Sequence, residues 1–131
     1  MRRMKAGGAP VAVCAALFGA AALVTSQASP AFAADPVHGK EVFQTCAACH
    51  SDKPDAIGPS LRGVVGRKSG SLDDFRYSNA MMRANLTWDD AKLRAYIKDP
   101  QAEVRGNRMP FGGLTDPKDI DDLIAYLDTY K

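Results

Sequence analysis

The sequence contains 131 residues, of which 46% are hydrophobic and 24% are charged, as in an ordinary globular domain. Its 17 basic and 15 acidic residues give a formal net charge of only +2, with no basic stripe along the chain. This balance excludes nucleic-acid binding as the main function and leaves the motifs to decide among the other classes.

The first 33 residues have the pattern of a cleaved secretory signal peptide. A basic start, Met-Arg-Arg-Met-Lys, precedes an apolar run at residues 11–24, and Ala-Phe-Ala at residues 31–33 fits a signal-peptidase site. The apolar run is shorter than the ~20 residues of a membrane-spanning helix, which argues against a retained anchor. We therefore expect residues 34–131 to form one mature domain in the periplasm.

Removal of this segment changes both the charge and the cysteine count. Loss of Arg2, Arg3 and Lys5 leaves 14 basic against 15 acidic residues, a net charge of −1. Only Cys46 and Cys49 remain, too few for a second disulfide or a four-cysteine zinc site. The mature chain is short enough that a large apolar cofactor would help it to form a core.

A first helix is predicted from Pro36 to about Ala48, with Asp35 as an acidic N-cap and the proline at the first helical position. Phe43 lies one turn before Cys46, so the helix carries an apolar face into the segment that follows.

Residues 46–50 read Cys-Ala-Ala-Cys-His, the attachment sequence of a c-type haem. The two sulfurs would bond to the haem vinyl groups as thioethers, and His50 would bind the iron from one side. The alternative is a redox-active or metal-binding Cys-x-x-Cys beside an incidental histidine. Haem is favoured because it uses both remaining cysteines and the adjacent imidazole.

Residues 51–70 are predicted to be irregular, because proline or glycine recurs every few positions. So long a loop in a small domain needs a packing surface, which a haem would supply. Its cations, Arg62, Arg67 and Lys68, either lie in solvent or serve the cofactor.

Two helices are predicted in the middle of the chain. A short one covers residues 78–83, capped by Ser78 or Asn79. Thr-Trp-Asp-Asp at residues 87–90 forms a capping box for the second, which must end by Asp99, before a proline.

The last helix follows a predicted loop at residues 101–114. Asp116 caps it, Pro117 takes the first position, and apolar residues recur at helical spacing as far as Tyr130. No stretch of the mature chain alternates in the manner of a strand, so the predicted fold class is all-α.

The second ligand of the iron decides the function, because an open position binds oxygen or peroxide and a closed one suits electron transfer. The candidates are Met81, Met82, Met109 and His38. A methionine on a helix is usually a core residue, whereas Met109 lies in a loop rich in glycine and proline. Met109 is therefore favoured, and His38 is interpreted as a surface or half-buried histidine.

Further landmarks accompany the haem motif across the mature chain. They are Gly39-Lys40 with Phe43, Gly58-Pro59 with Leu61, Gly66-Arg67-Lys68 with Gly70, Tyr77-Ser78, Trp88, Tyr96 with Pro100, Met109 with Phe111, and residues 123–127. With them, the sequence resembles a class I cytochrome c of the mitochondrial and small bacterial type. The resemblance covers nearly all of residues 34–131 and shows no insertion from Gly58 to Tyr126.

The resemblance implies a small cytochrome c fold, in which the first and last helices cross and the loops wrap around one covalent haem c. Gly39, Phe43, Leu123 and Tyr126 would form the crossing. The implied haem-binding residues are Cys46, Cys49, His50, Pro59, Arg67, Tyr77, Trp88, Tyr96 and Met109.

Individual roles also follow from the resemblance. His50 and Met109 would bind the iron, Pro59 would accept the other ring N–H of the histidine, and Tyr96 would approach the methionine sulfur. Near a buried haem propionate would lie Arg67, Tyr77 and Trp88, with Ser78 and Asn107 as further donors.

The sequence departs from the family pattern in two places. Met81 stands where relatives commonly carry an asparagine, which alters the hydrogen bonds expected near the haem. The lysines that ring the haem edge in mitochondrial relatives are mostly absent, and Arg108 is the main cation close to Met109. Steering towards an acidic partner should therefore be weak.

The resemblance implies a soluble, monomeric one-electron carrier rather than an enzyme. Its partners would be redox proteins, such as quinol–cytochrome c reductase, a terminal oxidase, a dehydrogenase or a photosynthetic centre. Two alternatives stay open at this point: a haem enzyme or gas-binding sensor with a labile distal ligand, and a subunit that passes electrons within a fixed dehydrogenase complex.

Overall fold

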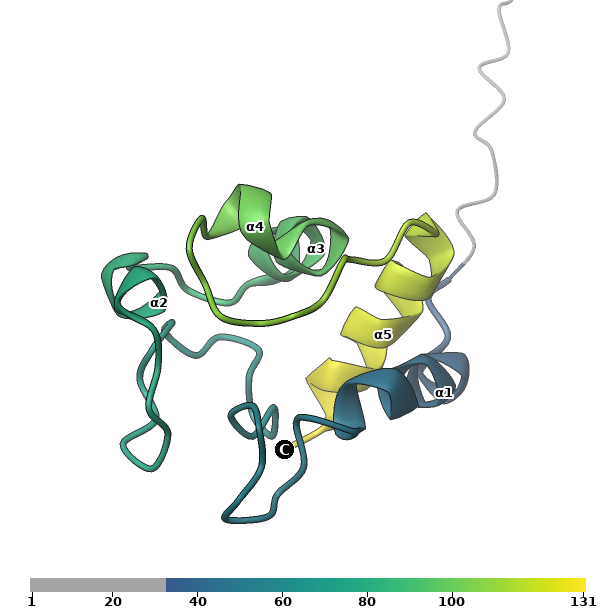
Figure 1. The fold of residues 1–131 in the computed structure, drawn as a ribbon. Coiled ribbons are helices and arrows are strands. Elements are labelled where there is room, and N and C mark those ends of the chain that lie inside the picture. The colour runs from purple at the N-terminus through teal and green to yellow at the C-terminus, as the bar shows by residue number, and fades with distance from the viewer. Residues whose placement is uncertain (1–32) are drawn as a thin grey trace, which may run out of the picture. The chain divides into compact units, whose positions relative to one another are not determined.

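The computed structural model describes residues 33–131, which contain five α-helices joined by irregular segments. In chain order the helices are α1 (Pro36–Ala47), α2 (Asn79–Arg83), α3 (Asp90–Lys98), α4 (Pro100–Glu103) and α5 (Pro117–Thr129) (Figure 1). The only extended pairing in the described residues is one antiparallel bridge between Lys68 and Thr87, so the all-α prediction is confirmed.

The predicted signal peptide lies, except for its last residue, outside the described residues. Among the helices of residues 33–131, none combines the length and the apolar character needed to cross a membrane.

The two long outer helices begin as the sequence predicts. Asp35 accepts a hydrogen bond from the Val37 amide at 2.8 Å, and Asp116 accepts one from the Lys118 amide at 2.8 Å. A proline follows each cap, where its missing N–H has no helical partner to lose. These starts are local signals, which explains why the sequence alone locates them.

The start of α3 differs from the prediction. Asp89, not Thr87, caps this helix by accepting the Lys92 amide at 2.8 Å. The backbone of Trp88 pairs with a distant loop instead: its amide donates to Arg67 O at 2.9 Å, and its carbonyl accepts from the Gly66 amide at 2.8 Å. Pairing with a distant loop therefore overrides the local capping box.

The predicted loop at residues 101–114 is wrong in its first part, which forms the short helix α4. Asp99 accepts a hydrogen bond from the Ala102 amide at 3.0 Å, and Pro100 occupies the first helical position. A third aspartate–proline pair thus starts a helix directly after the end of α3.

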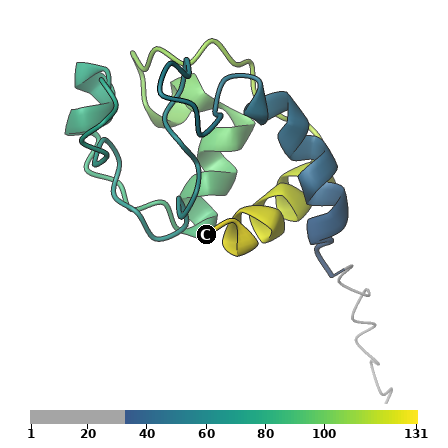
Figure 2. The same ribbon diagram turned by 90° about the horizontal axis from the view of Figure 1, so that it is seen from below.

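Helices α1 and α5 pack across each other, as the views in Figure 1 and Figure 2 both show. At the crossing, Gly39 lies so close to α5 that a β-carbon on it would stand 1.9 Å from the Asp122 carbonyl oxygen. Phe43 packs on Tyr126 with ring centroids 5.1 Å apart, and Leu123 is only 2% exposed. The predicted crossing and its four residues are confirmed.

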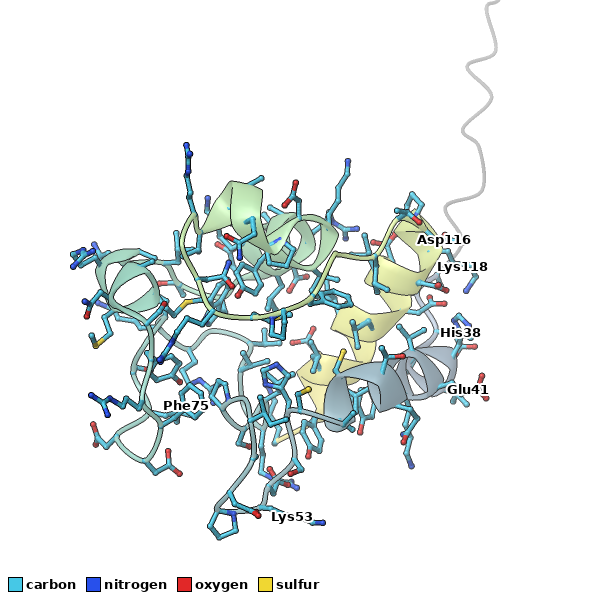
Figure 3. The ribbon with its side chains drawn as sticks, viewed as in Figure 1. His38, Glu41, Lys53, Phe75, Asp116 and Lys118 are labelled. Carbon is cyan, nitrogen blue, oxygen red and sulfur yellow. The ribbon has the colours of Figure 1, made fainter. Side chains whose placement is uncertain are left out.

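A buried carboxylate fastens one end of this crossing. Asp122 is 1% exposed, accepts the Asp35 amide at 2.7 Å and the Nδ1–H of His38 at 2.8 Å, and forms an ion pair with Lys118. Figure 3 shows His38 and Lys118 at the same end of the helix pair. His38 is thus a half-exposed contact between the two helices.

This network predicts a stability that depends on pH. The Asp35 amide, Lys118 and His38 lower the pKa of Asp122 from 3.8 to about 2, so its carboxylate stabilises the fold above pH 3.8. As the pH falls from 3.8 to about 2, the carboxylate becomes protonated and this stabilisation is lost. An Asp122→Asn variant is expected to be less stable than the parent near neutral pH and to approach it towards pH 2, measured by urea unfolding at a series of pH values.

The exposed Asp128 on the same helix supplies the control for this measurement. Asp128→Asn should change the free energy of unfolding little at any pH, because an exposed surface substitution rarely matters. A difference between Asp122→Asn and the parent that stays constant down to pH 2 would contradict the assigned role of the carboxylate.

Candidate haem site

The attachment segment lies where α1 ends. The amides of Cys49 and His50 both donate to the Cys46 carbonyl, at 3.0 and 2.8 Å, which closes a turn after the last helical residues. Both cysteines are free thiols of intermediate exposure. Three positions apart on one helical turn, they share a face and can reach the same flat ligand.

The ring of His50 is oriented by the loop that follows. Its Nδ1 lies 2.7 Å from the Pro59 carbonyl oxygen. A carbonyl only accepts, so Nδ1 carries the hydrogen and Nε2 keeps a free lone pair. Burial lowers the pKa of His50, against the opposing effect of this hydrogen bond, which favours the neutral ring that metal binding needs.

Gly58 lies against the same imidazole. A β-carbon at this position would stand 2.5 Å from Cε1 and 2.6 Å from Nδ1 of His50. The Gly58 amide also donates to the Cys49 carbonyl at 2.9 Å, which ties the loop to the attachment segment. The loop therefore holds the ring by both packing and hydrogen bonding.

Met109 lies on the segment between α4 and α5, beside an aromatic pair. The Tyr96 hydroxyl donates to Met109 Sδ at 3.6 Å, and the Tyr96 ring makes an edge contact with Trp88 at 5.0 Å between centroids. Burial raises the pKa of Tyr96 to about 12, so its hydroxyl keeps its hydrogen at neutral pH. The structure thus brings together three of the residues named from the sequence.

Arg67 is half-buried, and its guanidinium donates to the carbonyl oxygens of Ser60 at 2.8 Å and Arg62 at 3.1 Å. Burial lowers the pKa of Arg67, because the charge loses part of its solvation. Within residues 33–131 no carboxylate forms an ion pair with it. A half-buried cation in this position would be stabilised by an anionic ligand group.

Tyr77 and Phe75 form a second aromatic pair, with centroids 4.9 Å apart in an edge contact. Burial raises the pKa of Tyr77, and the charge of Arg67 acts against that rise. The Tyr77 hydroxyl therefore stays protonated and can donate a hydrogen bond.

Asn107 does not have the role that the resemblance implies. Both hydrogens of its side-chain amide are used within the protein, in bonds to the carbonyl oxygens of Pro100 and Val104 at 2.8 Å each. The prediction that Asn107 donates to a haem propionate is therefore wrong.

A cluster at the end of the chain was not found from the sequence. Arg62 pairs with Asp52 at 2.8 Å, lies 4.7 Å from the Tyr130 ring centroid and donates to the Lys131 carbonyl. The Tyr130 hydroxyl completes the cluster with a 3.1 Å bond to Asp52. It ties the loop that carries Pro59 to the end of α5, and no local pattern in the sequence signals it.

The described residues fit a covalently held haem. Several apolar side chains, among them Leu61, Val65, Met81 and Leu114, are only partly buried although they pack against the core. A large flat apolar group would cover them, while its carboxylates would neutralise Arg67. Two free thiols can bond to the vinyl groups of a haem, and a neutral imidazole and a thioether are ligands that its iron accepts.

Known proteins are similar to this chain over most of its length. The profile of the cytochrome c family matches residues 36–131. Cytochrome c2 of Rhodomicrobium vannielii is 48% identical over 112 residues, covering 83% of this chain and 89% of that protein. Cytochrome c2 of Rhodoblastus acidophilus is 46% identical over 102 residues, covering 76% and 95%.

A solved structure gives the same result for the fold. Cytochrome cH from Methylobacterium extorquens matches with a TM-score of 0.70 and 44% identity, over 72% of this chain and 98% of that one. The chain therefore belongs to the cytochrome c family, as an electron-transfer protein that carries one covalently bound haem c, with Cys46 and Cys49 fitting the attachment motif.

Proposed function

We propose that the protein is a periplasmic shuttle for single electrons and that His50 and Met109 are its two iron ligands. The haem supplies the one-electron couple when bound. The observation that carries the proposal is the 3.6 Å contact between the Tyr96 hydroxyl and Met109 Sδ, which presents the thioether beside a buried donor.

The residues around each ligand restrict its movement. Pro59 and Gly58 fix the plane of the His50 ring, and Tyr96 restrains the sulfur of Met109. The supporting groups, the Pro59 carbonyl and the Tyr96 hydroxyl, are both neutral. Neither ligand therefore needs to move or exchange a proton when an electron arrives or leaves. A closed site of this kind favours transfer over binding of small molecules.

Cyanide binding to the ferric protein tests this proposal against a haem enzyme or gas-binding sensor. If Met109 closes the site, cyanide should bind slowly at neutral pH, because the thioether must first leave. Rapid binding, at a rate that rises in proportion to the cyanide concentration, would show that the distal position is open and that Met109 is only a packing residue.

We further propose that residues 1–33 are removed after export and that residues 34–131 work in the periplasm. The basic start, apolar run and small-x-small site support this processing. The intact mass of protein taken from the periplasm should equal one haem plus residues 34–131, or residues 35–131 if cleavage follows Ala34 instead of Ala33. A mass that retains the first 33 residues would contradict the processing.

We propose that the protein is a monomer to which redox partners dock transiently. These partners would be quinol–cytochrome c reductase, a terminal oxidase, a dehydrogenase or a photosynthetic centre. Small, short-lived interfaces suit a carrier that must release each partner. Gel filtration of a native extract should yield the free monomer. A stoichiometric partner that co-purifies would instead indicate a subunit of a fixed complex.

The surface charge near Met109 predicts weak electrostatic steering. Arg108 is exposed and donates to the Arg76 carbonyl at 2.6 Å, while Thr45, Gln101 and Ala102 are exposed and uncharged. Arg108→Glu is therefore expected to change the rate of reduction by an acidic redox partner by less than about 10-fold, with little dependence on salt.

Stopped-flow reduction over a range of ionic strengths measures this effect, with Arg108→Gln as the control for loss of the side chain without charge reversal. A large loss of rate in Arg108→Glu at low salt, which disappears at high salt, would contradict this prediction and show that one cation dominates docking.

A further inference from the structure

Asn107 is a buried polar residue whose side chain is fully bonded. It is 8% exposed. Among the described residues, Asn107 and Asp122 are the only buried polar or charged ones. Its amide nitrogen donates to Pro100 O and Val104 O, both at 2.8 Å. Its amide oxygen accepts the Met109 backbone N–H at 2.9 Å.

These three bonds join the backbone of Met109 to a well-anchored element. Pro100, one end of the connection, is fully buried, and α4 packs against α3 (Figure 1). Val104, the other end, is 4% exposed. The side chain of Asn107 thus acts as a bracket between the buried base of α4 and the residue that carries the thioether.

Beyond Met109 the chain has few other restraints of this kind. In residues 33–131, the next backbone hydrogen bond along this segment is donated by Leu114 to Ile97 O at 2.9 Å. Pro110, which has no N–H, and Gly112-Gly113 lie between the two ties. A segment with so few backbone hydrogen bonds opens at low cost unless side chains such as Asn107 hold it.

Gln101 offers a matched comparison in the same place. Its side chain donates to Asn107 O at 3.1 Å and accepts the Gly106 amide at 3.2 Å, so it braces the segment before Met109. It is exposed, and the Met109 amide donates to Asn107 and not to Gln101. Removing it loosens the same loop while leaving the bond to Met109 in place.

We propose that Asn107 is a positioning residue that holds the Met109 backbone so that its sulfur stays at the iron. The proposal rests on the proposed function, in which Met109 is the distal ligand. A methionine side chain is flexible, and its position is fixed from two sides: Tyr96 contacts Sδ, and Asn107 holds the amide.

Loss of this bracket has a defined consequence for competing ligands. An added ligand binds only molecules in which the sulfur has left, so its apparent affinity rises with the fraction of such molecules. Releasing the Met109 amide increases that fraction. The apparent affinity for imidazole therefore reports on the bracket directly.

The test is an imidazole titration of the purified ferric holoprotein, followed in the visible spectrum. Asn107→Leu, which removes all three bonds, is expected to bind imidazole about 10-fold more tightly, equivalent to about 1.4 kcal/mol. Asn107→Ser should fall between this variant and the parent, because a serine oxygen can accept the amide two residues on. Gln101→Ala should stay within about 2-fold of the parent.

The outcomes separate the two proposals. A parent protein that lacks the weak red band of a sulfur–iron bond overturns the assignment of Met109 itself. A parent with that band, and an Asn107→Leu variant that binds imidazole no more tightly, overturns only the bracket. If Gln101→Ala and Asn107→Leu raised the affinity for imidazole equally, the bracket would also be overturned, because general loosening of the loop would then explain both increases.

Hydrogen exchange keeps the test decisive if Asn107→Leu does not fold. In the ferrous parent, the Met109 amide should exchange slowly although the segment is a surface loop. Asn107→Ser should increase the exchange rate of the Met109 amide more than that of the Leu114 amide. Fast exchange of the Met109 amide in the parent would overturn the bracket.

Discussion

Met109→Ala is expected to leave the haem attached while opening its distal side. Alanine provides no sulfur, and the Tyr96 hydroxyl loses the acceptor that it now contacts at 3.6 Å. Thioether ligation favours the reduced state, so the reduction potential should fall on the order of 0.1 V or more, measured by redox titration. The ferric protein should also lose its weak red band and bind cyanide rapidly.

Met82 provides the matched control, because it is another methionine, 53% exposed, on the short helix α2. Met82→Ala should keep the parental potential, spectrum and cyanide kinetics. If Met109→Ala also keeps the parental potential, Met109 is not the ligand and the account of the distal side is wrong.

The second large effect is expected at the helix crossing, where Gly39→Ala should strongly destabilise the fold. The new β-carbon would stand 1.9 Å from the Asp122 carbonyl oxygen and 2.9 Å from the Tyr126 β-carbon. Backbone cannot rotate away, so the two helices must separate. Overpacking costs about 1–3 kcal/mol or more, which outweighs the ~1 kcal/mol by which alanine favours a helix.

Urea unfolding of the holoprotein measures this change in the free energy of unfolding. Gly112→Ala is the control, because a β-carbon there would meet nothing within 4 Å. It should leave stability within about 0.5 kcal/mol of the parent. Equal stabilities of Gly39→Ala and the parent would show that α1 and α5 pack less closely than described.

The parts of the fold that the sequence predicts are those with local causes. Asp35-Pro36 and Asp116-Pro117 begin α1 and α5, because a carboxylate cap followed by proline needs no distant partner. The crossing of these helices was implied by the family resemblance, and the geometry of Gly39 supplies its physical reason.

The parts that the sequence prediction misses have two causes: contacts with distant residues, and an aspartate–proline helix start that the prediction does not use. Thr87 does not cap α3, because the neighbouring Trp88 pairs with the backbone of Arg67 and Gly66. Asp99-Pro100 at the start of α4 repeats the pattern that begins α1 and α5, but the same proline also predicts the end of α3, and the prediction uses only this second signal.

The candidate site shows the same division. Pro59 lies close to His50 in the sequence, and its carbonyl is 2.7 Å from the ring nitrogen. The resemblance implies that Asn107 donates to a haem propionate, yet both hydrogens of its side-chain amide are donated to the carbonyl oxygens of Pro100 and Val104. Hydrogen-bond direction follows from the folded backbone, so residue type alone could not reveal it.

The two proposed ligands, His50 and Met109, are consequently supported in different ways. A loop near in sequence, fastened to the chain end through Arg62 and Tyr130, holds His50 in place. Met109 depends on Tyr96 from α3 and on the Asn107 bracket, which connects it to α4. The distal side should therefore be the first to loosen when the protein is destabilised.

The most direct test of the central claim is the visible spectrum of the purified protein, ferric and ferrous, with its intact mass. We predict one covalent haem per chain and a weak red band in the ferric form that disappears on reduction. A ferric spectrum without that band, or a protein whose haem is removed by acid and organic solvent, would contradict a covalent haem closed by His50 and Met109.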